Sequence, residues 1–259
     1  MSSIVLERNA EVVLYDEQRM GRYDPDWFDA DVWRERGAKV HSTTGRGSVL
    51  MLDRGNETWV LRHYHRGGLV ANFVYDHYIW LGLHANRAFR EWRILAELHA
   101  GGFAVPEPLA ARVKRAGLLY QADILTRYLP DTRTLSALLR DGQLKDADWQ
   151  AIGAMVRGFH ERGVDHPDLT AHNILLDGAG QSFLVDFDNA KLRPPGAWSE
   201  RGLARLQRSL CKVALETGTE FDPVAWEVLE RSYRSFGREG SVAETRDQRT
   251  RAGGDRPAG

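Results

Sequence analysis

Apolar runs with a period of two dominate the first half of the chain. Residues 40–64 are predicted to form three strands, and in the last of them the alternation places Val60 and Arg62 on the same face. Two more strands are expected near residues 110–113 and 117–126. These segments predict a small antiparallel sheet near the N-terminus.

Apolar residues spaced by three and four positions predict helices. From about residue 86 to 100, Phe89, Trp92 and Leu95 share one face, and two glycines follow as a stop signal. Residues 146–162 repeat this pattern, and Asp146 is expected to cap the start of that helix. Further helices are expected at 25–36, 135–139 and 199–217. The second half of the chain is therefore predicted to be mainly helical.

The stretch from residue 160 to 188 carries the clearest chemical signal. It contains His166, then Asp168, then Asn173 five residues later, an Asp-Gly turn between two short apolar runs, and finally Asp186. An Asp-Gly pair between apolar runs predicts a hairpin. The hairpin would bring Asp186, after its second strand, back to the end where Asn173 leads into the first strand. His166 would brace the loop that carries Asp168.

Phosphoryl transfer explains why three such side chains would be needed. The reaction requires one carboxylate beside the attacking hydroxyl and two oxygen ligands that hold Mg2+ against the phosphates of ATP. Asp168 is the candidate catalytic base, and Asn173 and Asp186 are the candidate metal ligands. This pattern is typical of a phosphotransferase with a kinase fold. An ordinary turn and an ordinary strand end are the alternative interpretation.

Candidate nucleotide-binding residues precede this stretch. Gly45, Gly47 and Ser48 lie at a predicted turn between strands, where glycines let backbone N–H groups approach phosphate oxygens. Arg62 would present its cation to the phosphates, and Val60 would present a small apolar side chain to the base. A plain hairpin and a solvated arginine are the alternatives.

Two further features complete the predicted nucleotide site. Glu91, in the middle of the predicted helix, is the expected ion-pair partner of Arg62, with Glu97 as the competitor. Backbone groups from Thr126 to Tyr128, at the predicted hinge, would meet the adenine. The expected division is an N-terminal lobe at 1–127, a catalytic C-terminal lobe at 128–236 and a disordered tail at 237–259.

Composition limits which binding partners and which cellular compartment are expected. A formal charge of -1 over 259 residues gives no reason to expect nucleic acid. The single cysteine excludes an internal disulfide, and no apolar run reaches the roughly 18 to 20 residues that span a membrane. Nine histidines invite a zinc hypothesis, but the carboxylate and cysteine spacings of zinc sites are missing. A cytoplasmic protein with no obligate protein partner is expected.

Two segments could contact the acceptor, the molecule that receives the phosphoryl group. Residues 69–83 are rich in aromatic side chains, which suits a lid or a membrane-facing element, with core packing as the alternative. The predicted helix 199–217 carries a basic stripe that would attract anionic sugar-lipid headgroups, with a solvated helix face as the alternative. The stripe is formed by Arg201, Arg205, Arg208 and Lys212. The short segment after Asp186 favours a small or lipid-linked acceptor over a peptide.

Several segments between about residues 45 and 190 resemble the lipopolysaccharide core kinases, and among them the 3-deoxy-D-manno-octulosonic acid (Kdo) kinases. They are residues 45–48, 60–70, 87–92, 105–113, 120–126, 168–177 and 185–188. The resemblance implies a two-lobed, protein-kinase-like α+β fold. It also implies ATP-dependent phosphorylation of the 4-hydroxyl of Kdo on Kdo-lipid A by a peripheral protein at the cytoplasmic side of the inner membrane.

The resemblance leaves alternatives for the acceptor. An arginine in the third predicted strand matches this family, whereas the aromatic loop 71–82 and the tail after residue 237 depart from it. A heptose kinase and an aminoglycoside-type small-molecule kinase would share the fold. A pseudokinase is disfavoured because Asp168, Asn173 and Asp186 are all present.

Overall fold

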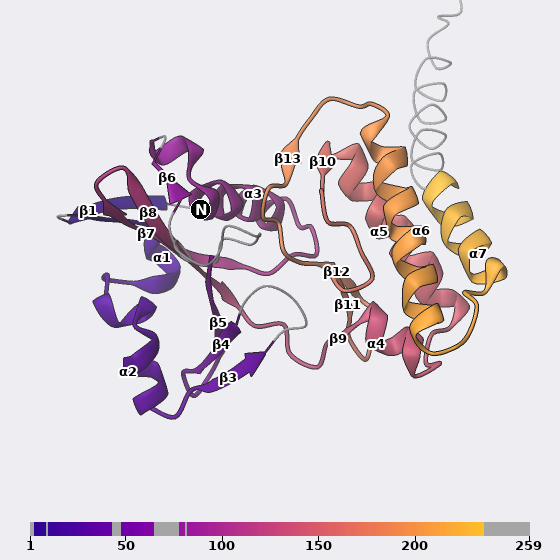
Figure 1. Cartoon of the computed structure of the whole chain (residues 1–259), viewed down its shortest axis with the longest axis horizontal. Coiled ribbons are helices and arrows are strands. Elements are labelled where there is room, and N and C mark those ends of the chain that lie inside the picture. The colour runs from indigo at the N-terminus through magenta and orange to yellow at the C-terminus, as the bar shows by residue number, and fades with distance from the viewer. Residues whose placement is uncertain (1–2, 9, 43–47, 65–77, 81, 236–259) are drawn as a thin grey trace, which may run out of the picture. The chain divides into compact units, whose positions relative to one another are not determined.

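The computed structural model describes residues 3–8, 10–42, 48–64, 78–80 and 82–235 (Figure 1). Its strands and helices confirm the predicted α+β class. The chain forms two compact units. The first comprises Met1–Thr132, Asp165–Asp168 and Phe183–Leu192, and the second comprises Arg133–Val164, Leu169–Ser182 and Arg193–Gly259.

The three segments expected from the sequence do not correspond directly to these two units. The lobe boundary between residues 127 and 128 stays a prediction, because the two units interleave along the chain. The predicted disordered tail, 237–259, lies outside the described residues, as does most of the aromatic stretch 69–83.

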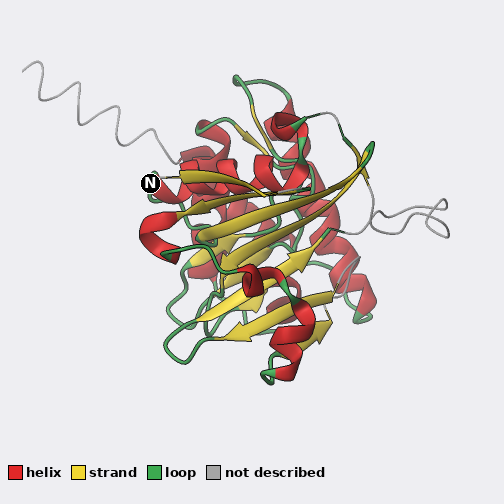
Figure 2. Ribbon diagram, turned by 90° about the vertical axis from the view of Figure 1, so that its left-hand side faces the viewer, coloured by secondary structure: helices red, strands yellow, loops and turns green. Residues whose placement is uncertain are grey.

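An antiparallel sheet forms the first unit's framework (Figure 2). Its strands follow the order β1-β2-β7-β8-β5-β4-β3, and the short β6 pairs with β8. The bounds are β1 Ser3–Arg8, β2 Glu11–Asp16, β3 Lys39–Ser42, β4 Ser48–Asp53, β5 Thr58–His63, β6 Tyr78–Ile79, β7 Pro108–Ala116 and β8 Leu119–Arg127. The predicted strands are all present.

Strands β1 and β2 have no counterpart among the sequence predictions. In β2 the consecutive residues Val13, Leu14 and Tyr15 are all buried, so both faces of the strand are covered. Such a strand shows no alternation of apolar and polar residues. The period-two criterion therefore missed it.

Helix α3 (Arg87–Ala100) packs on β7 and β8, as the periodicity predicted. The Asn86 side chain caps it by accepting a 3.2 Å hydrogen bond from the Phe89 N–H. Phe89, Trp92 and Leu95 are buried. The short helices α1 (Glu17–Met20) and η2 (Leu83–Ala85) complete the helical elements between β2 and α3, together with the pair described next.

The single helix predicted over residues 25–36 is wrong, because two pieces replace it. The 3-10 helix η1 (Pro25–Phe28) precedes α2 (Ala30–Glu35), and Asp29 between them has an extended backbone. The Asp29 side chain accepts hydrogen bonds from the N–H groups of Asp31 and Val32, so it starts a new helix. Buried aromatic side chains of both pieces join one apolar core with strands of the sheet.

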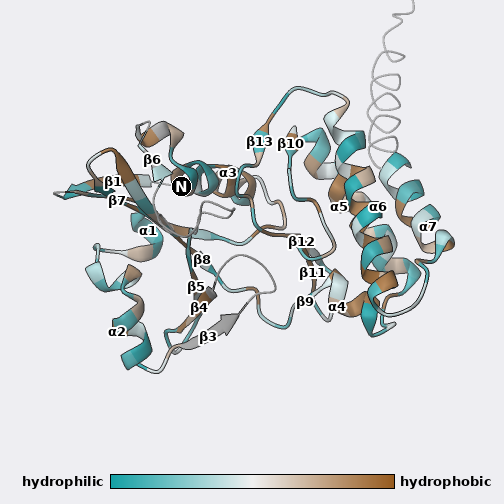
Figure 3. Cartoon of the chain, viewed as in Figure 1, coloured by the Kyte–Doolittle hydropathy of each residue, from teal (hydrophilic) through white to brown (hydrophobic). Residues whose placement is uncertain are grey.

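Helices form the second unit: α4 (Leu135–Arg140), α5 (Asp146–Glu161), α6 (Trp198–Glu216) and α7 (Pro223–Ser235). The longer ones carry apolar residues on one side and polar residues on the other (Figure 3). Helix α7, absent from the sequence predictions, packs on α5. A Cβ at Gly153 of α5 would lie 2.3 Å from the Leu229 carbonyl oxygen, so glycine permits this close approach.

The predicted cap of α5 is also wrong. Lys145, not Asp146, is the N-cap residue, and its N–H donates a 2.8 Å hydrogen bond to the side chain of Asp148. Asp146 is the first helical residue instead. A carboxylate three residues into a helix can reach back to the cap N–H, and that contact decides where this helix begins.

The predicted Asp-Gly turn is confirmed. The Asp177 N–H donates to the Gln181 carbonyl at 3.1 Å, and the Asp177 side chain accepts from the N–H groups of Ala179 and Gln181.

The second half of the chain also contains short strands. They are β9 Arg133–Thr134, β10 Val164–Asp165, β11 Ile174–Leu176, β12 Ser182–Leu184 and β13 Lys191–Leu192. Within the second unit β9 pairs with β11. None of the described helices has the length and apolar composition of a membrane span.

Candidate active site

The segment after β12 holds the aspartate that was predicted to bind metal. Asp186 follows Val185, whose carbonyl oxygen lies 3.2 Å from Nε2 of His166. Phe187 is buried and meets the His166 ring edge-on, with ring centroids 5.1 Å apart. Asp186 itself has a φ of 63°, a left-handed conformation that few non-glycine residues adopt. His166 therefore braces the residues on both sides of Asp186.

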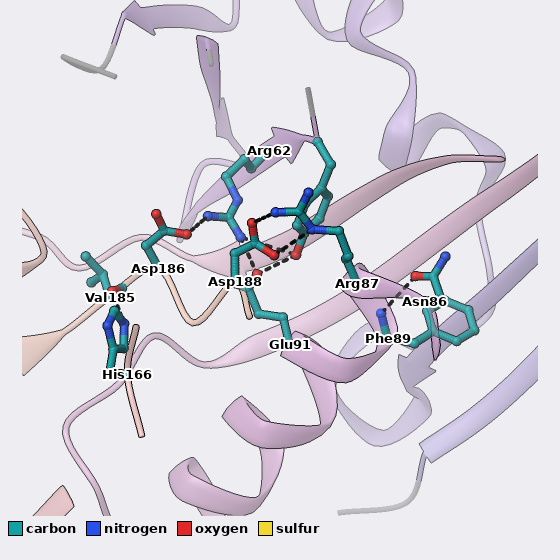
Figure 4. A network of polar contacts seen from close by, with 10 residues as sticks. Arg62, Asn86, Arg87, Phe89, Glu91, His166, Val185, Asp186 and Asp188 are labelled. Atoms are coloured by element: carbon teal, nitrogen blue, oxygen red, sulfur yellow. Dashed lines mark hydrogen bonds and ion pairs between the residues drawn. The ribbon is translucent and has the colours of Figure 1, made fainter. Parts of the chain in front are cut away.

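Arg62 of β5 links two acids that come from different elements (Figure 4). Its Nη1 contacts Oδ1 of Asp186, and its Nη2 contacts Oε2 of Glu91 on α3. The Tyr64 hydroxyl accepts a 3.2 Å hydrogen bond from Nη2 of Arg62 and donates to the same Glu91 oxygen. The predicted pair of Arg62 with Glu91, in preference to Glu97, is confirmed.

Burial controls the ionisation of this network. Only 4% of the Glu91 side chain is exposed, and burial raises the pKa of its carboxyl while the Arg62 guanidinium opposes the rise. Burial, and then the charge of Glu91, raises the pKa of the Tyr64 hydroxyl, which stays a donor at neutral pH. Burial lowers the pKa of His166. The Asp186 side chain is 39% exposed, so one face of its carboxylate can reach a ligand.

A cavity of about 160 Å³ lies in the first unit beside this network. Apolar side chains form much of its wall: Val60, Leu95, Ile124, Leu129 and Val185. Arg62, Glu91 and Asp186 line it as well, so the apolar wall meets a cation and two carboxylates. Such a combination fits an aromatic base next to phosphates, and a hard cation held by a carboxylate oxygen. Because Val60 and Arg62 both line the cavity, their predicted common face is confirmed.

Not every candidate nucleotide-binding residue gathers at this cavity. Thr126 lines it, whereas Tyr128 does not, and the Tyr128 N–H donates a 2.9 Å hydrogen bond to the Thr58 carbonyl. Gly45 and Gly47 lie outside the described residues. Ser48 is the first residue of β4, and its side chain is not described. The roles assigned to these residues stay predictions.

Asp168 and Asn173 belong to different units. Asp168 is an exposed residue of the first unit, two positions after His166, and Asn173 precedes β11 in the second unit. Among the described side chains, no group of three or more His, Cys, Asp or Glu could hold a metal ion. A cation here would thus depend on Asp186, on an amide or carbonyl ligand, and on the phosphates of a nucleotide.

A second ion pair beside Asp186 was not predicted. Nε of Arg87 donates to Oδ1 of Asp188 at 2.9 Å, and Nη2 of Arg87 contacts Oδ2. Both residues lie in segments that resemble the family, 87–92 and 185–188, but no role was predicted for either. Tyr64 was also missed, although the period of two that joined Val60 with Arg62 places Tyr64 on the same face.

Comparison with known proteins identifies relatives over most of the chain. Residues 30–233 match the model of the lipopolysaccharide kinase (Kdo/WaaP) family. A 3-deoxy-D-manno-octulosonic acid kinase of Xylella fastidiosa (strain M12) is 43% identical over 222 residues, covering 85% of this chain and 88% of the relative. One from Photobacterium profundum is 36% identical over 231 residues, covering 86% of this chain and 98% of the relative.

A solved structure supports the fold. The chain of WaaP in complex with acyl carrier protein matches this structure with a TM-score of 0.56 at 18% identity, covering 90% of this chain and 94% of that one. At this identity the similarity concerns the fold alone. It agrees with the predicted kinase-like architecture.

Proposed function

The chain belongs to the lipopolysaccharide kinase (Kdo/WaaP) family, and we propose that it transfers the γ-phosphoryl group of ATP to the 4-hydroxyl of Kdo on Kdo-lipid A. The observation that carries this proposal is the match, over most of the chain, to relatives named Kdo kinase. The products would be ADP and a Kdo-lipid A that carries one more phosphate.

Asp168 is the catalytic base in this proposal. Its carboxylate accepts the proton of the attacking hydroxyl while the new O–P bond forms and the bond between the γ-phosphorus and the ADP oxygen breaks. A positioned base of this kind contributes about 10² to 10⁴-fold in rate. The exposure of Asp168 supports the role, since a bulky sugar-lipid must reach it.

The nucleotide occupies the cavity, with its base between apolar side chains such as Val60 and its phosphates beside Arg62. Asp186 and Asn173 are the residues that would hold Mg2+, and the ion would supply positive charge to neutralise the phosphate oxygens. Backbone N–H groups of Gly45, Gly47 and Ser48 add to the phosphate contacts. The ion pairs of Arg62 with Glu91 and Asp186 support this arrangement, because they hold the guanidinium in place before a ligand arrives.

The acceptor is embedded in a bilayer, so the protein works at an anionic membrane surface as a peripheral protein. The basic stripe of Arg201, Arg205, Arg208 and Lys212 supports this part of the proposal. Its residues are spaced by three and four positions on α6, and apart from the partly buried Arg205 they are exposed. Each such cation near an anionic surface contributes about 1 kcal/mol of attraction.

Mass spectrometry of the acceptor tests the proposal. Incubation with ATP and Mg2+ is expected to add the mass of one phosphate to Kdo-lipid A, and fragmentation is expected to locate it on Kdo rather than on the glucosamine backbone. Heptose-bearing, aminoglycoside and protein acceptors are tested in parallel. Turnover of one of these, with none on Kdo-lipid A, would replace the acceptor but not the phosphotransfer chemistry. Absence of turnover on all of them, with ATP bound, would favour a pseudokinase.

A further inference from the structure

Arg87 and Asp188 make a two-point contact next to Asp186. The Nε and Nη2 atoms of Arg87 meet the two carboxylate oxygens of Asp188, the fork geometry in which an arginine fixes the orientation of a carboxylate (Figure 4). The two side chains are 26% and 21% exposed, respectively, so water competes with this pair less than at an open surface.

Aromatic rings and a backbone contact hold the Arg87 side of this pair. The guanidinium carbon lies 4.9 Å from the ring centroid of Tyr78 and 5.8 Å from that of Tyr64. The Arg87 N–H, at the first position of α3, lies 3.5 Å from the Tyr120 hydroxyl. Arg87 is therefore positioned by its neighbours independently of Asp188.

The loop on the Asp188 side has a backbone that needs external support. Asp186 and Asn189 both have a φ of 63°, and Asp188 lies between them. The turn is closed by a 2.9 Å hydrogen bond from the Ala190 N–H to the Phe187 carbonyl. Two non-glycine residues in left-handed conformations so close together persist only where surrounding contacts hold them.

We propose that Arg87 and Asp188 are positioning residues that set the orientation of the Asp186 carboxylate. This inference rests on the proposed function, in which Asp186 would be a ligand for the Mg2+ that accompanies ATP. Arg87 and Glu91 are four positions apart on α3, so they share one side of the helix. That side of α3 thereby holds the loop twice, directly at Asp188 and through Arg62 at Asp186.

Neutralising the pair tests the proposal without any acceptor. Binding of Mg2+-ATP to the full chain is measured by isothermal titration calorimetry for wild type, Arg87→Gln and Asp188→Asn. Loss of a group that orients a metal ligand typically costs 10 to 100-fold in affinity, and about 10-fold or more is expected for each variant. Because the two act as one unit, the double variant is expected to lose no more than the weaker-binding single variant. Arg133→Gln, which removes an exposed arginine paired with Asp141, is the matched control and should change affinity less than two-fold.

Epistasis with Asp186 separates a positioning role from a merely structural one. In an Asp186→Asn background, Arg87→Gln is expected to cause little further loss, because its effect passes through the Asp186 carboxylate. The same fold-loss in both backgrounds would overturn the proposal, and so would unchanged affinity in wild-type background. If Arg87→Gln lowers Tm strongly, Arg87→Lys replaces it, since lysine keeps the charge but cannot make the fork. A negative acceptor assay with these binding losses intact would remove the proposed acceptor and leave this inference standing.

Discussion

The two units differ in how deeply they bury ion pairs, although the first also has exposed pairs such as Arg34 with Asp31. The first encloses ion pairs such as Arg62 with Glu91, of which the glutamate is 4% exposed, and Arg112 with Asp123, at 10% and 6%. In the second, the ion pairs Arg140 with Glu216, Arg157 with Glu161 and Arg234 with Glu200 have both side chains at least 35% exposed. The helices of the second unit pack through apolar faces instead.

This difference separates stabilising from positioning roles. A buried ion pair must offset the loss of water from both charges, so it is weak evidence for stability. Exposed pairs contribute only about 0 to 1 kcal/mol each. The buried Glu91 of the first unit therefore makes most sense as a group that holds Arg62, and through it Asp186, in a fixed orientation, whereas the second unit derives its stability from apolar packing.

Removing the proposed base should give the largest effect. Asp168→Ala is expected to lower kcat for phosphoryl transfer by at least about 10²-fold while Mg2+-ATP affinity stays within a few-fold, because the base acts on the acceptor proton. Steady-state kinetics and calorimetry measure the two quantities. Asp141→Ala, which removes an exposed carboxylate from the second unit, is the control. Near-normal turnover of Asp168→Ala would exclude Asp168 as the base.

Breaking a buried pair should cost far more stability than breaking an exposed one. Arg62→Ala leaves Glu91 buried without its arginine and is expected to lower the free energy of unfolding by on the order of 3 kcal/mol. Arg157→Ala in α5 breaks an exposed pair with Glu161 and should cost about 0.5 kcal/mol or less. Urea unfolding of both variants provides the comparison. Equal losses would contradict the contrast between the units.

The apolar packing of the second unit can be disturbed at one glycine. Gly153→Ala would push a methyl group against the Leu229 carbonyl oxygen and is expected to destabilise the protein by about 1 to 3 kcal/mol. Gly178→Ala is the matched control, since a Cβ there meets nothing within 4 Å. Thermal unfolding measures both. A Tm for Gly153→Ala that equals that of Gly178→Ala would show that α5 and α7 separate at little cost.

Acid should weaken the first unit through His166. Burial lowers the pKa of this histidine in the folded state, whereas the unfolded value is about 6.5. Below that pH the unfolded chain takes up a proton that the folded chain resists. Stability is therefore expected to fall with pH below about 6.5, by at most about 1.4 kcal/mol per pH unit, until the folded pKa is reached. His166→Gln should remove this slope in urea titrations at several pH values, while His172→Gln, at an exposed position, should keep it.

Several parts of the candidate site could be predicted from local patterns. The period of two joined Val60 with Arg62, and the three-and-four spacing of α3 located Glu91 in the middle of a helix. The Asp-Gly turn followed from turn chemistry that involves few residues. Predictions failed where one side chain redirected the backbone, as Asp29 does between η1 and α2 and Asp148 does at the start of α5.

The sequence by itself determined the α+β class, the approximate limits of helices α3 to α6, and the acids and bases available for phosphoryl transfer, because these depend on neighbours within about one turn or one strand. The pair of Arg62 with Glu91 was predicted, but only the tertiary structure decided that Arg62 also meets Asp186 and that Arg87 meets Asp188. Arg62 and Asp186 are 124 residues apart, and Arg87 and Asp188 are 101 apart. Pairing between residues so far apart in the sequence depends on how the chain folds back and on which side chains become buried together. Neither can be predicted from the periodicity of the sequence.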